Sequence, residues 1–155
     1  MIGVQVKVFG ISRVERKLNN LEKKVSRKIV KKALKETAKK DVLMKYKTNA
    51  KSMIGGKLGK LIAKNIKLRP QKDVKRVKKG NAFLIVDITK KANETFVVTS
   101  KSGKRNYIPN AIEFGHGNVK PVTFGRNTYN ETKSAAVKNI GKRIWAGIKA
   151  ELKGK

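Results

Sequence analysis

The spacing of apolar residues predicts a strand, a long helix, several short strands and a last helix. Apolar and polar side chains alternate over residues 2–8, a period of two that is typical of a half-buried β-strand. From Ser12 to about residue 48, apolar residues recur every three to five positions and predict an amphipathic helix, which Ser12 and Glu15 would cap. The apolar stripe of that helix comprises Val14, Leu18, Leu21, Val25, Ile29, Ala33, Ala38, Val42 and Tyr46.

The length of this helix raises a question of packing. A helix over residues 12–48 would be roughly 55 Å long, whereas a compact domain of this size has a radius of gyration of only about 15 Å. The helix must therefore break, for which Asn19-Asn20 is a candidate, or extend beyond its own domain. In the second case its apolar stripe needs cover, and a neighbouring copy of the chain is the natural candidate.

The segment after this helix is glycine-rich and basic. Residues 55–59 predict a flexible stretch, and one helical turn at about residues 58–62 precedes a strand over residues 64–68. Pro70 ends that strand because proline cannot donate a ladder hydrogen bond. A polar, basic loop is expected at about residues 69–80.

Two further strands are predicted in the middle of the chain. Residues 82–89 and 95–100 are rich in β-branched and aromatic side chains, and together they predict an antiparallel hairpin. Residues 102–106 read as another turn. The short element over residues 107–115 contains Pro109, which argues against a central strand.

A final helix is expected from about residue 125 to residue 152. Its predicted apolar stripe comprises Tyr129, Val137, Ile140, Ile144, Ile148 and Leu152, joined by Ala136 and Trp145. The fold class is therefore α+β, with an antiparallel sheet of about four strands packed against a long N-terminal helix and a C-terminal helix. A length of 155 residues fits a single domain over residues 1–155.

Charge is the dominant feature of the composition. Forty Lys and Arg against ten Asp and Glu give a formal net charge of +30, which attracts polyanions or acidic protein surfaces. Because Lys greatly outnumbers Arg, contacts with nucleic acid would be to phosphate and independent of sequence. The alternative is that the lysines simply cover solvated faces. The candidate contact residues are Lys24, Lys28, Lys31, Lys35, Lys39, Lys75, Arg76, Lys78 and Lys79.

Material for catalysis is scarce. The chain has no cysteine, which excludes disulfides and thiolate metal sites, and its one histidine, His116, lies between two glycines. Glu113 is the one acid in an apolar setting, where a backbone cap or an ion pair is expected rather than a general base. We therefore expect no enzyme activity, no cofactor and no metal.

No apolar run approaches the roughly 20 residues that span a bilayer, so a soluble product made in the cytoplasm, without a membrane partner, is expected.

The last third of the chain carries a recognisable order of motifs. Tyr107 is followed by Glu113-Phe114-Gly115-His116, a short loop, and then Pro121, Phe124 and Arg126 at the start of the last helix. This order resembles the tail-completion family of tailed bacteriophages, also described as tail-component or neck proteins. The family typically has an aromatic residue, then Glu-Phe-Gly-Thr, then Pro-Phe-x-Arg-Pro-Ala before a last helix.

The resemblance spans nearly the whole chain, with several departures. The first strand, the long basic helix and the step Gly56-Lys57-Leu58 also agree with the family pattern. His116 stands where the family has Thr, Asn127-Thr128 replace Pro-Ala, and two residues separate Pro121 from Phe124. The Pro that usually follows the first helix and the Thr before the glycine are missing.

The resemblance implies a structural virion protein at the head–tail junction. Its copies would form a ring, sixfold to match the tail, and would contact the connector or stopper, the tail-tube or tail-terminator proteins and DNA in the channel. Phe114 and Phe124 would anchor a packed junction, and Arg126 would pair with Glu113 or with a neighbour's carboxylate. Gly115 and Gly117 would adopt backbone angles closed to other residues. These contacts could lie within one subunit or between subunits.

Two other classes of function stay open. A non-specific, nucleoid-type DNA-binding protein would account for the charge alone. A basic toxin nuclease would depend on His116 or Glu113. Within the phage interpretation, the basic surface would face either DNA or acidic partner proteins, and we favour the partner proteins.

Overall fold

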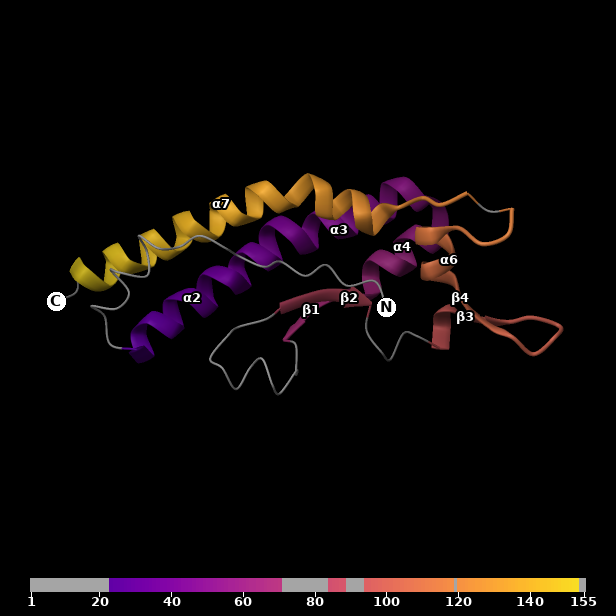
Figure 1. The fold of residues 1–155 in the computed structure, drawn as a ribbon, viewed down its shortest axis with the longest axis horizontal. Helices are drawn as coiled ribbons and strands as arrows, with labels where there is room; N and C mark the ends of the chain where they lie inside the picture. Colours follow the sequence, from indigo (N-terminus) through magenta and orange to yellow (C-terminus); the bar gives the residue numbers. More distant parts are fainter. Residues whose placement is uncertain (1–22, 71–83, 89–93, 119, 154–155) are drawn as a thin grey trace.

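Two long antiparallel helices lie side by side along the molecule, and most of the smaller elements gather near one end (Figure 1). The computed structural model describes residues 23–70, 84–88, 94–118 and 120–153. The predicted first strand, the Ser12–Glu15 cap and the candidate break at Asn19-Asn20 lie outside these residues.

The first long helix is continuous from residue 23 to residue 54. No Gly or Pro interrupts these residues, and the helix ends where Gly55 adopts a positive φ of 74°. Two short π-helical stretches interrupt the α-helical hydrogen bonding without ending the helix. Its segments are α2 (Lys23–Thr37), π-helical η1 (Ala38–Leu43), α3 (Met44–Asn49) and π-helical η2 (Ala50–Ile54).

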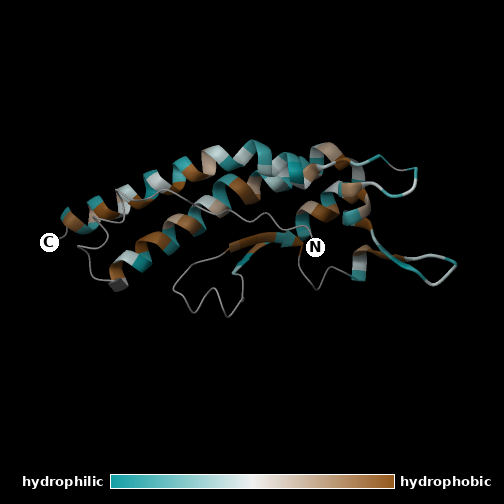
Figure 2. Cartoon of the chain, viewed as in Figure 1, coloured by the Kyte–Doolittle hydropathy of each residue, from teal (hydrophilic) through white to brown (hydrophobic). Residues whose placement is uncertain are grey.

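The second long helix, α7 (Phe124–Lys153), agrees closely with the predicted final helix. It packs against α2, η1, α3 and η2, so the apolar stripe of the first helix is buried by the same chain. A neighbouring copy is therefore not needed to cover the described part of that stripe. Figure 2 shows apolar and hydrophilic bands alternating along both helices, as amphipathic packing requires.

The buried face of α7 differs from the predicted stripe. Tyr129, Val137, Trp145 and Leu152 are all between 40% and 59% exposed, so their assignment to that face is wrong. The face includes two threonines instead, which the hydrophobic pattern could not reveal. Their hydroxyl groups donate to the carbonyls four residues earlier, at 2.7 Å, which satisfies them in the core. The buried positions are Phe124, Gly125, Thr128, Thr132, Ala136, Ile140, Ile144 and Ile148.

The glycine-rich segment is a helix and not a flexible stretch. It forms α4 (Gly56–Asn65), which packs on η2. A Cβ on Gly59 would lie 2.7 Å from the carbonyl oxygen of Ala50, so only glycine permits this close approach of the two helices. The prediction was wrong because glycine was taken as a sign of flexibility where it serves close packing.

The strands form two small antiparallel sheets, and the predicted single sheet of about four strands is not found in the described part of the chain. β1 (Ile66–Pro70) pairs with β2 (Leu84–Ile88). β3 (Val97–Thr99) pairs with β4 (Arg105–Tyr107) across a turn in which Gly103 has a φ of 78°. The predicted pairing of residues 82–89 with 95–100 is therefore wrong. Each strand pairs across a different connection, and the predicted turn at residues 102–106 is where the second hairpin forms.

Two short helical elements complete the described chain. A 3₁₀ turn, η4 (Glu94–Phe96), precedes β3, and α6 (Ile108–Phe114) follows β4 directly. Pro109 lies in the first turn of α6, where a missing N–H costs nothing. The short element that the sequence placed over residues 107–115 is thus a helix, and it leads into the loop before α7.

Candidate functional site: the corner between helices α6 and α7

Glu113 joins the end of α6 to the beginning of α7. Its side chain is only 2% exposed, and its two carboxylate oxygens accept hydrogen bonds from the backbone amides of Gly125 at 2.7 Å and Arg126 at 2.9 Å. A carboxylate at this position satisfies two free amides and complements the positive end of the helix dipole. Of the two structural roles expected for Glu113, the structure therefore shows the backbone cap.

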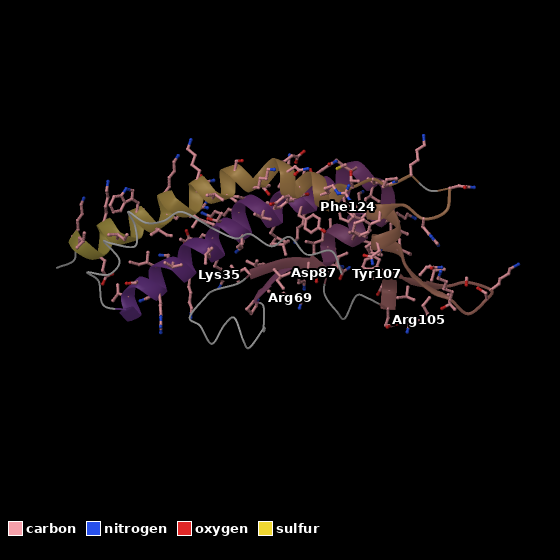
Figure 3. All side chains as sticks on the ribbon, viewed as in Figure 1. Lys35, Arg69, Asp87, Arg105, Tyr107 and Phe124 are labelled. Carbon is pink, nitrogen blue, oxygen red and sulfur yellow. The ribbon has the colours of Figure 1, made fainter. Side chains whose placement is uncertain are left out.

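Two stacked aromatic rings, those of Phe124 and Tyr46, lie in the core at this corner. Phe124 is fully buried and its ring stacks on Tyr46 of α3, with 5.5 Å between ring centroids. Burial raises the pKa of the Tyr46 hydroxyl, and the negative charges of Glu113 and Asp87 raise it further. The predicted anchoring role of Phe124 is thus seen within one chain, where it fixes α7 on α3 (Figure 3).

The loop between α6 and α7 is held at both ends. Gly115 and Gly117 have φ values of 80° and 57°, which confirms the predicted need for glycine at these positions. The amide of Val122 donates to the carbonyl of Ile112 at 2.8 Å and closes the loop. Thr123 has a φ of 51°, a strained angle for a β-branched residue, so the surrounding contacts must impose it.

Phe114 lies next to the buried Glu113 but points the other way. It is 58% exposed, so the prediction that it anchors a packed junction is wrong within the single chain. His116, Pro121 and Arg126 are exposed as well. Arg126 contacts Glu113 through its backbone amide, and the predicted bidentate pairing of its guanidinium with that carboxylate is not the contact seen.

Tyr107 lies on the other side of α6, at the end of β4. Its ring meets the buried ring of Phe96 edge-on, with 6.5 Å between centroids, which ties the second hairpin to the body of the molecule. Burial raises the pKa of Tyr107, and the charge of Asp87 adds to this effect. Tyr107 and Phe124, two residues of the family-like motif, thus lie near the same end of the helical hairpin (Figure 3).

A buried polar contact behind the corner was not predicted from the sequence. Asn49 is 5% exposed, and its amide group donates to Thr128 at 3.0 Å and to Glu131 at 2.9 Å. Glu131 also pairs with Lys45 at 3.2 Å. The four side chains join α3 to the first turns of α7. The one sign of this contact in the sequence is that Asn49, a polar residue, interrupts the apolar face of its helix.

A second polar contact joins η1 to the middle of α7. Arg143 pairs with Asp41 at 2.8 Å and donates to the buried hydroxyl of Thr37, while Asn139 donates to Asp41 at 3.0 Å. The hydrogen bond from Arg143 holds the pKa of Asp41 below its ordinary value. Asp41 and Lys45 lie four residues apart on one helix, a spacing that favours an ion pair. Each forms its ion pair with a residue of α7 instead.

The basic residues of the first helix face outward. Lys28, Lys31, Lys35 and Lys39 are all exposed. The side chain of Lys24 and the predicted contact residues Lys75, Arg76, Lys78 and Lys79 lie outside the described residues.

Within the described ranges, no group of three His, Cys, Asp or Glu side chains could hold a metal ion. No described helix combines the length and apolar character needed to cross a membrane.

Known proteins do not assign a family to this fold. No protein-family model, no curated protein and no solved structure matches the chain. Three features of the molecule therefore carry any functional argument: the capped corner with its exposed phenylalanine, the polar contacts between the long helices, and the basic outer face.

Proposed function

We propose that this chain is a structural virion protein of a tailed bacteriophage that acts at the head–tail junction. Copies would assemble into a ring, sixfold to match the tail, and join the connector or stopper to the tail-tube or tail-terminator proteins. The observation that carries this proposal is the corner itself. The motif that resembles the pattern of tail-completion proteins caps α7 through Glu113 and leaves Phe114 exposed beside it.

The rigidity of the corner supports a role in assembly. Single exposed apolar residues are common on protein surfaces, but Phe114 is held between a buried cap and a glycine in the left-handed region. A rigid aromatic side chain loses little conformational entropy when a partner covers it, and such residues often dominate interface energies. Phe114 is therefore the proposed anchor, with His116, Pro121 and Arg126 exposed near it as further contacts.

Two measurements test the assembly role. The chain should be found in purified tailed particles by quantitative mass spectrometry, at about the copy number of one ring. The isolated protein should also form a ring in native mass spectrometry, and Phe114→Ser should shift it to monomers. Val98→Ser is the matched control, because Val98 is a similarly exposed apolar residue, at 53%, on β3.

The results that contradict the proposal are equally concrete. If the chain is missing from purified particles, the proposed virion role is wrong. If Phe114→Ser and Val98→Ser have the same effect on ring formation, Phe114 is not the anchor. A nuclease role is less compatible with the corner, since Glu113 could act as a general base only by releasing the start of α7.

The nucleoid-type alternative makes a different prediction about affinity. A protein whose function is to coat DNA should bind it at sub-micromolar concentration in physiological salt. Under the assembly proposal, contacts between exposed lysines and phosphate are weak and vanish at that ionic strength. A gel shift at several salt concentrations separates the two.

A further inference from the structure

We propose that the outward face of α2 and η1 binds the phosphate backbone of double-stranded nucleic acid without reading its sequence. The face, called the basic face below, consists of Arg27, Lys28, Lys31, Lys32, Lys35, Lys39 and Lys40, all of them exposed. This inference concerns a different surface from the α6–α7 corner and does not depend on the assembly role.

The basic face is a regular array of charges. Arg27, Lys31, Lys35 and Lys39 follow one another at steps of four, so neighbouring Cβ atoms are about 5–6 Å apart on a helix. The row extends over roughly 18 Å. Lys35, in the last turn of α2, is labelled in Figure 3. A row with one positive charge at every fourth residue suits a partner with evenly repeated negative charge.

Most acids of the described residues are engaged away from this face. Asp41, Asp87, Glu94 and Glu131 form ion pairs with Arg143, Arg69, Arg105 and Lys45. Glu113 caps α7. Of the described acids, Glu36 and Glu151 remain, and only Glu36 lies on α2. Among the described residues, Glu36 is thus the one acid on α2 beside these seven cations, and the excess of positive charge favours an external anion.

The chemistry of the face favours a duplex over the other polyanions. Interfaces with proteins are enriched in aromatic residues at their centre and depleted in Lys, whereas residues 23–45 contain no aromatic side chain and many lysines. Single-stranded nucleic acid is held by stacking on aromatic rings, which this face does not provide. Lys acts as a point charge for phosphate, and duplex DNA carries one phosphate charge per about 1.7 Å of its axis.

The salt dependence of binding tests the inference with a matched pair of variants. Lys31→Gln, Lys35→Gln and Lys39→Gln are combined in one variant of the basic face. Lys57→Gln, Lys60→Gln and Lys64→Gln are combined in the control, which removes the same charge from exposed positions on α4. Binding of the whole chain to two labelled 30-base-pair duplexes of unrelated sequence is measured by fluorescence anisotropy over a range of salt concentrations.

The expected results follow from counterion release. The slope of log K against log salt should fall by about 3 in the basic-face variant, roughly one per lysine, and should change little in the control. The two duplexes should bind alike, and replacing the same three lysines with arginine should preserve the slope.

Three outcomes would overturn the inference. The first is an equal loss of slope in both glutamine variants, which would mean that only net charge matters. The second is tighter binding of single strands than of duplexes. The third is binding of polyglutamate, but not of duplex, through the same lysines, which would make the partner an acidic protein. None of these outcomes bears on whether Phe114 holds a ring together.

Discussion

At the scale of single residues, the buried carboxylate of Glu113 determines where α7 begins. The side chain comes from the end of α6. Its two oxygens accept the hydrogen bonds that the amides of Gly125 and Arg126, in the first turn of α7, cannot make within the helix. No residue of the preceding loop therefore has to supply the cap. This arrangement also makes the corner sensitive to the loss of one oxygen atom.

We expect Glu113→Gln to destabilise the protein by about 1–3 kcal/mol. The new amide group would place a donor against one of the two backbone N–H groups, which would then stay buried without an acceptor. Urea unfolding measures the change, and Glu151→Gln on the exposed end of α7 is the control, with an expected change within about 0.5 kcal/mol. Equal unfolding midpoints for Glu113→Gln and the unchanged protein would show that Glu113 is not a cap.

Two glycines in helices should respond in opposite ways to alanine. Gly59→Ala would bring a Cβ within 2.7 Å of the carbonyl oxygen of Ala50, and we expect a loss of about 1–3 kcal/mol from overpacking. Gly141→Ala in α7 meets nothing within 4 Å, so the better helix propensity should stabilise the protein by about 0.5–1 kcal/mol. Thermal unfolding of both variants would test this contrast, and shifts of the same sign would contradict it.

At the scale of elements, the long helices are held in register by polar contacts as well as by their apolar stripes. Apolar residues pack along the whole hairpin, and Ile29 of α2 lies so close to Gly147 of α7 that a Cβ there would be 2.7 Å away. The pairing of Asp41 with Arg143 and of Asn49 with Thr128 is directional and joins specific positions of the two helices. These contacts lie beside or within the π-helical stretches η1 and η2, where the helix repeat is locally altered.

The contact of Asp41 with Arg143 should make stability depend on pH. Because the pKa of Asp41 is lowered in the folded protein, the contact stabilises above the unfolded pKa of about 3.9 and is lost as the pH falls through the folded value. Asp41→Asn should therefore cost about 1–3 kcal/mol at pH 6 and less at pH 3.

Urea unfolding at the two pH values measures this difference, and Arg143→Gln provides the matched test from the other side. Removing the guanidinium takes away the hydrogen bond that lowers the pKa of Asp41, so the stability difference between Arg143→Gln and the unchanged protein should also be smaller at low pH. The part that remains at low pH is the lost hydrogen bond from Arg143 to Thr37. A cost of Asp41→Asn that is the same at both pH values would show that Asp41 does not contribute through its charge.

The two long helices were predictable from the sequence, whereas the short helices, the pairing of strands and the details of the corner were not. A repeat sustained over many residues identified the last helix to within about one residue at each end. The strands are three to five residues long, and their partners depend on connections that carry no pattern. At the corner, the apolar neighbours of Glu113 singled it out in the sequence. The exposure of Phe114 follows from its place at the end of α6, and the sequence did not reveal this helix because Pro109 was read only as an argument against a central strand.

At the scale of the whole molecule, charge and packing oppose each other. Two slender helices carry much of the core, and the formal charge of +30 surrounds them. Like charges on neighbouring turns of α2 repel each other, and the described ion pairs engage only four cations. The folded state should therefore be under net repulsion at low ionic strength.

Salt should consequently stabilise the protein. Raising NaCl from about 20 mM to about 500 mM shortens the Debye length to well below 10 Å, and we expect a gain of about 1–2 kcal/mol, or roughly 2–8 °C in Tm. The variant with Lys31, Lys35 and Lys39 changed to Gln should start from a higher Tm at low salt and gain less. A Tm that falls as NaCl rises would mean that attraction within the ion pairs outweighs the repulsion, and the basic face would then need no external anion to relieve it.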